Sequence, residues 1–167
     1  MHLLLCGMMG CGKTTVGKEV ARLMDREWAD TDDEIVKIHG EIKDIFSRFG
    51  EKYFRGIETQ ILQTLLQKNN LVLSAGGGLV LQSENAALLK EKANIVYLRA
   101  KADTLVERLR NDLSRPLLQG TALSEKVHTL LKERAPTYES VADFTVDVDG
   151  KTAEEIAHEI VKWAIEN

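Results

Sequence analysis

The chain has 167 residues, of which 44% are hydrophobic and 29% charged, and its formal net charge is -4 at pH 7. This length suits one domain built around a full central sheet, and the composition is ordinary for a globular protein that folds alone, so we expect a monomer. An acidic balance does not suggest the basic patch that a nucleic-acid partner would need. No apolar stretch is long enough to span a bilayer or to form a signal-peptide core, which predicts a cytoplasmic protein without a membrane partner.

The two cysteines, Cys6 and Cys11, lie close together in the sequence. A pair this sparse makes no disulfide framework, so we expect two reduced thiols. The four histidines are scattered without the spacing of metal ligands, and the sequence therefore predicts no zinc site.

Short apolar runs alternate along the chain with amphipathic stretches, which is the pattern of an α/β fold. The expected strands are His2–Cys6, Glu27–Asp30, Leu71–Ser74, Ile95–Arg99 and Phe144–Val148. The expected helices are Lys13–Asp25, Gly50–Gln67, Ser83–Lys90, Ala102–Asn111, Ser124–Tyr138 and Thr152–Ile165. We expect a three-layer α/β/α fold in which helices cover both faces of a five-stranded parallel sheet.

Two segments fit this pattern less well. Thr31–Gly50 is charged, with short helical stretches, and Asn111–Thr121 carries Gly120 and the first of two prolines, Pro116. Mobile functional segments usually lie outside the rigid core. The sequence therefore predicts a single domain over 1–167, with a substrate-binding insertion at about residues 31–60 and a lid at about residues 111–121.

The segment Gly7–Thr14 matches the pattern G-x-x-x-x-G-K-[ST], after an expected strand and at the start of an expected helix. In that context the pattern predicts a phosphate-binding loop, whose backbone N–H groups and helix N-terminus attract phosphate. Lys13 is expected to reach the β- and γ-phosphates and to act in catalysis, and Thr14 to place its hydroxyl on one Mg²⁺. Cys11 is either a reactive thiol or a small inert filler. The residues expected to contact ATP here are Gly10, Cys11, Gly12, Lys13, Thr14 and Thr15.

Asp30-Thr31-Asp32 lies where the second strand is expected to end, beside the phosphate-binding loop. Ligands of open α/β sheets bind at the carboxyl ends of the strands. Asp30 is expected to join Thr14 in holding Mg²⁺, and Asp32 to accept or orient the proton of an acceptor hydroxyl. Equally, these acids serve a helix N-terminus well without any ligand.

The stretch from Phe54 to Glu58 is helical, so Arg55 and Glu58 share a face and could form only a surface ion pair. Gly76-Gly77-Gly78 follows the third apolar run, and three glycines permit a close approach of the backbone to a ligand. Arg115 lies in the second insertion and Arg134 in the helix that follows it. Isolated arginines are usually solvated, yet their forked donors suit phosphate and carboxylate groups.

In this order, the motifs resemble those of the shikimate kinases over essentially the whole chain. The resemblance implies a P-loop kinase of the nucleoside monophosphate kinase type, which uses ATP and Mg²⁺ to phosphorylate the 3-hydroxyl of shikimate in aromatic amino-acid biosynthesis. The segments that carry it are Gly7–Thr15, Asp30–Asp32, Gly50–Arg55 with Glu58, Gly76–Gly78, Arg115–Leu118, and Arg134 with Tyr138.

The resemblance also implies a role for each matching residue. Asp32, Arg55, Gly77 and Arg134 would contact shikimate, with the two arginines on its carboxylate, and the neighbouring Gly76 and Gly78 would line the same pocket. Asp30 would reach Mg²⁺ through water. Arg115 would move with the lid onto the phosphates as a catalytic group. Arg108 would stack on adenine, although its surroundings are not distinctive.

Gly56 departs from the pattern, because relatives often carry a larger residue after the arginine. Its presence puts the rigidity of that helix in doubt. Two other functions remain open. One is a kinase for another small metabolite, such as gluconate, or for a nucleotide, although neither substrate would require two arginines on a carboxylate. The other is a guanine-nucleotide switch protein, but the guanine-reading N-K-x-D motif is absent from the sequence.

Overall fold

The computed structural model describes residues 1–111 and 121–167. Nearly all of the lid expected at residues 111–121, including Arg115, therefore lies outside the described residues. Among those described, no helix combines the length and the apolar character needed to cross a membrane.

A five-stranded parallel sheet forms the centre of the fold, as the sequence predicts. Strand order is β2-β3-β1-β4-β5: the first strand lies in the middle, the chain passes to β2 at one edge and returns to β3 beside β1, and it then continues through β4 to β5 at the other edge. The strands are β1 (His2–Cys6), β2 (Trp28–Asp30), β3 (Val72–Ser74), β4 (Ala93–Arg99) and β5 (Phe144–Asp147).

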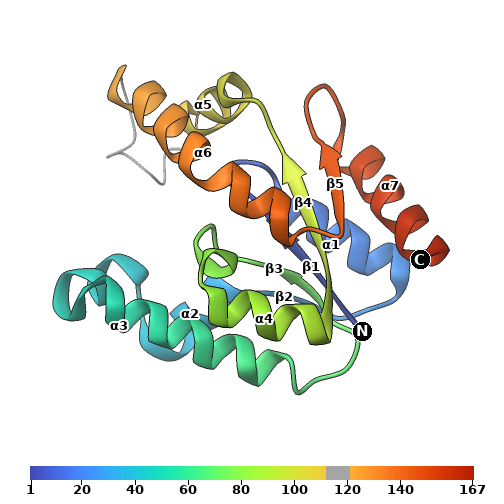
Figure 1. Cartoon of the computed structure of the whole chain (residues 1–167), viewed down its shortest axis with the longest axis horizontal. Helices are drawn as coiled ribbons and strands as arrows, with labels where there is room; N and C mark the ends of the chain where they lie inside the picture. Colours follow the sequence, from blue (N-terminus) through green and yellow to red (C-terminus); the bar gives the residue numbers. More distant parts are fainter. Residues whose placement is uncertain (112–120) are drawn as a thin grey trace.

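Helices cover both faces of this sheet (Figure 1). Helices α1 and α7 pack together on one face, whereas α4 and α6 lie on the other, and α2 and α3 pack together beside β2. The expected three-layer α/β/α arrangement is thereby confirmed. The helical elements are α1 (Lys13–Met24), α2 (Thr31–His39), α3 (Ile42–Leu65), the 3₁₀ turn η1 (Leu79–Leu81), α4 (Ser83–Lys92), α5 (Ala102–Arg110), α6 (Thr121–Val141) and α7 (Ala153–Glu166).

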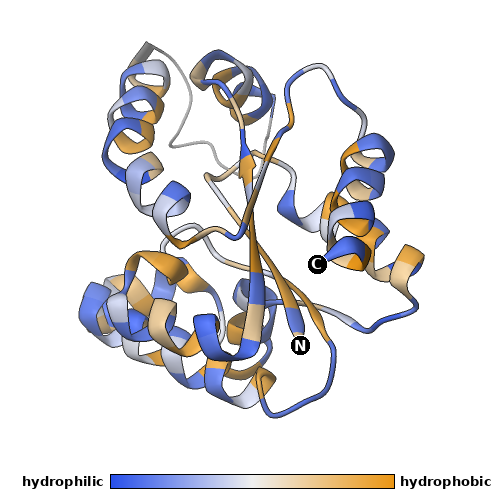
Figure 2. Ribbon diagram, turned by 45° about the vertical axis from the view of Figure 1, so that its right-hand side comes forward, coloured by the Kyte–Doolittle hydropathy of each residue, from blue (hydrophilic) through white to orange (hydrophobic). Residues whose placement is uncertain are grey.

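The sheet forms the core because it is covered on both sides. Leu3, Leu4 and Leu5 of β1 are each at most 1% exposed, and the strands appear as an apolar centre among helices of mixed hydropathy (Figure 2). Parallel strands buried on both faces have continuous rather than alternating hydrophobic sequences. This explains why five short apolar runs were sufficient to predict the sheet.

Gly50 divides helix α3 into two parts. The sequence predicts a helix that starts at Gly50; α3 extends back to Ile42, but Gly50 itself has non-helical backbone angles (φ 84°, ψ 174°) and separates the two parts. Glycine adopts this positive φ without steric cost, so the chain turns there and resumes its helix. The segment Thr31–Gly50, which was expected to hold short helical stretches, contains two of them: α2, which Asp30 caps, and the part of α3 that precedes Gly50.

Three neighbouring strands end at the same edge of the sheet. Asp30 at the end of β2 pairs in register with Ser74 at the end of β3, and Ser74 pairs with Leu5 of β1. The segments that follow are α2, the triple glycine and the phosphate-binding loop. The parallel topology thus brings together three motifs that are far apart in the sequence.

Candidate active site

A cleft of about 730 Å³ opens at this edge of the sheet. It is lined by the loop after β1, the start of α2, the middle of α3, the triple glycine, α5 and α6. The predicted site residues that line it are Gly10, Gly12, Lys13, Thr14, Thr15, Asp30, Asp32, Arg55, Gly76, Gly77, Gly78, Arg108 and Arg134. The cleft therefore collects nearly all of the residues that were selected from the sequence.

The loop between β1 and α1 has the backbone conformation of an anion-binding turn. Gly10 and Gly12 have φ of 84° and 99°, which side-chain-bearing residues rarely adopt. Gly12 is also the N-cap of α1 and has no side chain to cap the helix. The first backbone N–H groups of α1 are consequently left for a ligand in the cleft, where the helix dipole favours negative charge.

Lys13 lies folded over the same loop. Its Nζ donates to the carbonyl oxygens of Gly7 at 2.8 Å and Met8 at 3.0 Å. The ammonium is thus held at the mouth of the turn, with backbone carbonyls as partners. A phosphate oxygen carries more charge than a carbonyl and is a stronger acceptor for this group.

Asp30 links the phosphate-binding loop to α2. One carboxylate oxygen, Oδ1, accepts from the backbone N–H groups of Asp32 at 2.9 Å and Asp33 at 3.2 Å, and so caps α2. The other, Oδ2, accepts from the hydroxyl of Thr14 at 3.2 Å. Helix capping and ligation had seemed alternatives for these acids, but the geometry allows Asp30 to do both with different oxygens.

This pair of oxygens also suits a divalent cation. Mg²⁺ prefers oxygen ligands and is usually bound by one or two protein groups, together with water and substrate phosphates. Thr14 Oγ1 and Asp30 Oδ2 provide two such atoms beside the loop. Within residues 1–111 and 121–167 no group of three or more His, Cys, Asp or Glu residues forms a larger metal centre.

Each glycine of the triple glycine lies beneath one charged side chain. A β-carbon on Gly76 would lie 3.1 Å from Cγ of Asp32, and one on Gly78 would lie 2.7 Å from Cζ of Arg55. On Gly77 it would lie 3.3 Å from Nη1 of Arg134. Side chains here would displace these groups, so the three glycines give one carboxylate and two guanidinium groups access to the floor of the cleft.

Arg55 is held by carboxylates on its own helix. Its Nη1 donates to Glu58 Oε1 at 2.7 Å, and its Nη2 to Glu51 at 3.3 Å. Glu58 is only 1% exposed and also accepts from Gln82 Nε2 at 3.2 Å. Burial raises the pKa of the Glu58 carboxyl, whereas the bond from Arg55 lowers it. The interpretation of Arg55 and Glu58 as a surface pair is therefore wrong, because Glu58 is part of the interior.

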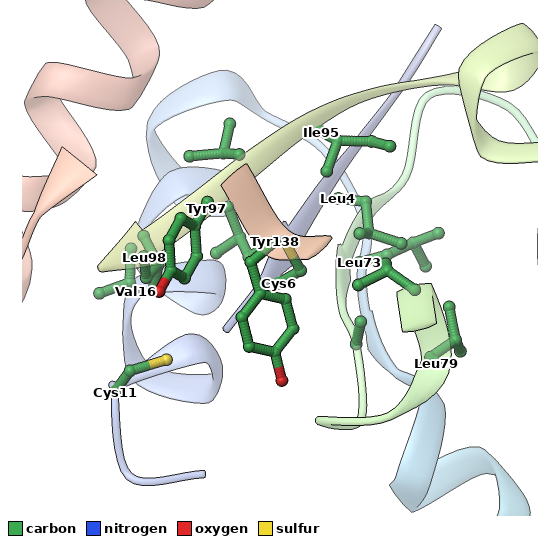
Figure 3. Close-up of a cluster of buried hydrophobic side chains, with 14 of the residues drawn as sticks. Leu4, Cys6, Cys11, Val16, Leu73, Leu79, Ile95, Tyr97, Leu98 and Tyr138 are labelled. Carbon is green, nitrogen blue, oxygen red and sulfur yellow. The ribbon is translucent and has the colours of Figure 1, made fainter. Parts of the chain in front are cut away.

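Three further predicted residues have different surroundings. Arg108 lies over the phosphate-binding loop, where its Nη1 donates to the carbonyl of Gly10 at 3.2 Å. Cys11 is 1% exposed, and Figure 3 shows its side chain among the buried hydrophobic residues. Reactive cysteines are partly exposed, so this burial favours the inert alternative, and ATP can meet only the backbone of Cys11. Arg115 lies outside the described residues.

The cleft also has lining residues that sequence reasoning missed. Ile42 and Phe54 supply apolar surface, and Asp33 adds a third carboxylate near Asp30. Burial and the charge of Asp30 raise the pKa of Asp33. Phe54 directly precedes Arg55 and could have been inferred from that position. Ile42 had no such signal, because its helix was not expected to begin there.

The comparisons with known proteins agree with this geometry. A family model described as shikimate kinase matches residues 9–165. A shikimate kinase of Thermodesulfovibrio yellowstonii is 43% identical over 162 residues, which cover 96% of this chain and 93% of the relative. One of Neisseria gonorrhoeae is 46% identical over 146 residues, covering 87% of this chain and 86% of the relative.

Solved structures give the same result. The shikimate kinase of Acinetobacter baumannii in complex with shikimate superposes with a TM-score of 0.92 at 38% identity, covering 99% of this chain and 93% of that one. A gluconokinase of Sinorhizobium meliloti superposes with a TM-score of 0.66 at 17% identity, covering 99% and 91%. At that identity the second likeness extends to the fold alone.

Proposed function

The chain belongs to the shikimate kinase family, and we propose that it transfers the γ-phosphoryl group of ATP to the 3-hydroxyl of shikimate. The products are shikimate 3-phosphate and ADP. The family is one of ATP-dependent kinases that act on an alcohol. The observation that carries the proposal is the layer of Asp32, Arg134 and Arg55 over three glycines, in the same cleft as a phosphate-binding loop.

ATP binds with its β- and γ-phosphates in the loop that begins α1. The N–H groups around Gly12 hold the phosphates, and the ammonium of Lys13 exchanges its carbonyl partners for phosphate oxygens. Arg108, at the rim of this loop, covers the nucleotide. Thr14 and Asp30 would hold the one Mg²⁺ that accompanies ATP, and a bound ion would supply positive charge to the phosphate oxygens.

Shikimate binds on the opposite side of the cleft. Arg55 and Arg134 hold its carboxylate, because planar guanidinium groups bind carboxylates through paired hydrogen bonds. Glu58 and Glu51 keep Arg55 in place while its remaining donors face the substrate. Phe54 and Ile42 pack against the apolar edge of the ring.

Asp32 acts on the hydroxyl that receives the phosphoryl group. Its carboxylate lies over Gly76 and within the same cleft as Lys13, and its backbone N–H donates to Asp30. A carboxylate so placed orients the hydroxyl toward the γ-phosphorus and accepts its proton as the new P–O bond forms. Lys13 and Arg115 stabilise the charge that develops on the transferred group.

The remaining parts of the proposal concern the whole chain. Residues 1–167 form a single kinase domain, in which about residues 31–60 bind the acceptor and about residues 111–121 close over ATP. The enzyme works in the cytoplasm as a monomer, with neither nucleic acid nor membrane as partner. The absence of a membrane-crossing helix among the described residues is compatible with this location.

A variant of Arg134 tests the acceptor site. Arg134→Ala removes a donor that we assign to the acceptor's carboxylate and not to ATP, so the KM for shikimate should rise about 10- to 100-fold while the KM for ATP changes little. Arg55→Lys keeps a positive charge near buried Glu58 but loses the paired donors of the guanidinium. It should therefore raise the KM for shikimate by a smaller factor, again with little change in the KM for ATP. Arg99→Ala is the matched control, because Arg99 pairs with Asp147 away from this cleft. Equal rises in both KM values for Arg134→Ala would contradict the assignment.

A further inference from the structure

Three fully buried polar side chains hold the backbone of the segment Gly76–Leu79, here called the glycine loop. Gly76 N donates to Thr31 Oγ1 at 2.9 Å, and the hydroxyl of Tyr138 donates to Gly77 O at 2.5 Å. Asn85 Nδ2 donates to Leu79 O at 3.0 Å. Thr31, Asn85 and Tyr138 are each 0% exposed. The bonds of Thr31 and Asn85 are buried, and the bond of Tyr138 is partly buried because Gly77 lines the cleft.

The three side chains belong to the helices that carry or adjoin the charged groups of the cleft. Thr31 directly precedes Asp32 on α2, and Tyr138 lies one turn after Arg134 on α6. Asn85 is on α4, but its Oδ1 accepts from Thr59 Oγ1 at 2.9 Å. Thr59 lies on α3 one turn after Arg55, whose carbonyl oxygen is 3.2 Å from the same hydroxyl.

The same pairing is visible from the side of the glycines. Asp32 lies over Gly76, whose N–H is bonded to Thr31, and Arg134 lies over Gly77, whose carbonyl is bonded to Tyr138. Arg55 lies over Gly78, next to the carbonyl that Asn85 holds. Asp32 and Arg134 therefore lie on helices that hold the glycine loop directly, through Thr31 and Tyr138. The helix of Arg55 holds the loop indirectly, because its Thr59 bonds to Asn85.

A loop of three glycines needs such external support. Glycine has the widest range of backbone conformations and no side chain to pack, so ordering this segment is entropically costly. Buried backbone groups without partners would cost still more. Burial also raises the pKa of the Tyr138 hydroxyl, which therefore remains a protonated donor.

We propose that Thr31, Tyr138 and Asn85 are positioning residues that fix the glycine loop relative to Asp32, Arg134 and Arg55. This inference rests on the proposed function, because it assigns the three charged side chains to the acceptor. The residues do not touch the substrate. Their effect is to hold three groups from three helices in one geometry, which matters because misplacement by about 1 Å can cost about 100-fold in rate.

Tyr138→Phe and Thr31→Val test the proposal, since each removes a hydroxyl while keeping most of the side chain's volume. Thr31→Ser restores the hydroxyl and is the rescue variant. Tyr97→Phe is the matched control for Tyr138→Phe, because Tyr97 stacks on Tyr138 at 5.1 Å between ring centroids and is equally buried (Figure 3). Among the described residues, Tyr97 makes no hydrogen bond to the glycine loop.

The first measurement uses the protein without substrates. Hydrogen exchange of a peptide covering residues 75–81 should be about tenfold faster in Tyr138→Phe and Thr31→Val than in the wild type, because each has lost one of the bonds that hold the loop. Tyr97→Phe and Thr31→Ser should exchange at the wild-type rate. Unchanged exchange in Tyr138→Phe and Thr31→Val would overturn the proposal whatever the acceptor is.

The second measurement compares the two substrates. In Tyr138→Phe the Kd for shikimate should rise about tenfold, while the Kd for ATP stays within about twofold of the wild-type value. A purely structural role would weaken both substrates together, and that result would contradict positioning. If the wild-type protein bound no shikimate while the exchange results held, the proposed function would fail and the support of the loop would stand.

Discussion

The guanidinium of Arg55 occupies the space in which a side chain on Gly78 would begin. A β-carbon built on Gly78 would lie 2.7 Å from Cζ of Arg55, well inside van der Waals contact. Gly78 has φ of -98°, which any residue adopts. Its lack of a side chain is therefore required by Arg55 and not by the backbone.

Gly78→Ala should consequently fold and yet bind the acceptor poorly. The new methyl group would push Arg55 out of its place over the loop, so we expect the KM for shikimate to rise at least about tenfold. Steady-state kinetics with each substrate varied in turn would measure this, with the melting temperature as the control for folding. A normal KM for shikimate in a well-folded Gly78→Ala protein would show that Arg55 has another position when the acceptor is bound.

Two glycines inside helices should respond to alanine in opposite directions. Gly56 on α3 is exposed and has no atom within 4 Å of a built β-carbon, so Gly56→Ala should stabilise the protein by about 0.5–1 kcal/mol. Gly17 on α1 is buried, and its β-carbon would lie 2.7 Å from Nε1 of Trp28. Gly17→Ala should therefore destabilise by about 1–3 kcal/mol. Urea unfolding of both variants makes the comparison, and a destabilised Gly56→Ala protein would contradict it.

His2 should make the stability of the fold sensitive to mild acid. Its Nδ1 accepts from the N–H of Leu71 at 3.1 Å, and its Nε2 lies 3.3 Å from the carbonyl of Leu66, so the neutral ring satisfies both backbone groups. Burial lowers the pKa of His2 from 6.5, against a raising effect of Leu66, and the N-terminus, Lys92 and Arg26 lower it further. The unfolded chain then binds a proton more readily than the folded one.

The sign of the effect follows directly. Stability supplied by neutral His2 is complete above about pH 6.5 and declines as the pH falls below it, because only the unfolded state gains the proton readily. We expect the wild type to lose up to about 1 kcal/mol more than His2→Gln between about pH 7.5 and about pH 5.5. Urea unfolding at both pH values tests this. Equal losses in the two proteins would mean that His2 does not titrate differently on unfolding.

Much of the fold could be predicted because its signals are local. Each strand of a buried parallel sheet is a short apolar run, and the phosphate-binding loop is a continuous motif between a strand and a helix. The five-stranded sheet, the helices on both faces and the family were all predicted correctly. The helix expected from Gly50 is found as the second part of α3, because the non-helical backbone of Gly50 divides the stretch Ile42–Leu65 into two helices.

The site was less accessible to sequence reasoning, because its contacts join distant segments. Glu58 had the spacing of a surface partner for Arg55, and nothing local indicated that it would be buried and would accept a hydrogen bond from Gln82. Tyr138 is 61 residues from the glycine whose carbonyl it holds. Asn85, an ordinary helical residue in the sequence, had no recognisable role until the structure placed it beside Thr59.

The central claim is that the layer of Asp32, Arg134 and Arg55 selects a cyclic alcohol bearing a carboxylate. ADP release by the purified protein with ATP and Mg²⁺ should be measured against shikimate, quinate, gluconate and CMP, with GTP hydrolysis followed separately. We expect rapid ADP release with shikimate alone. Equal or faster turnover with gluconate or CMP, or GTP hydrolysis that needs no acceptor, would contradict the account.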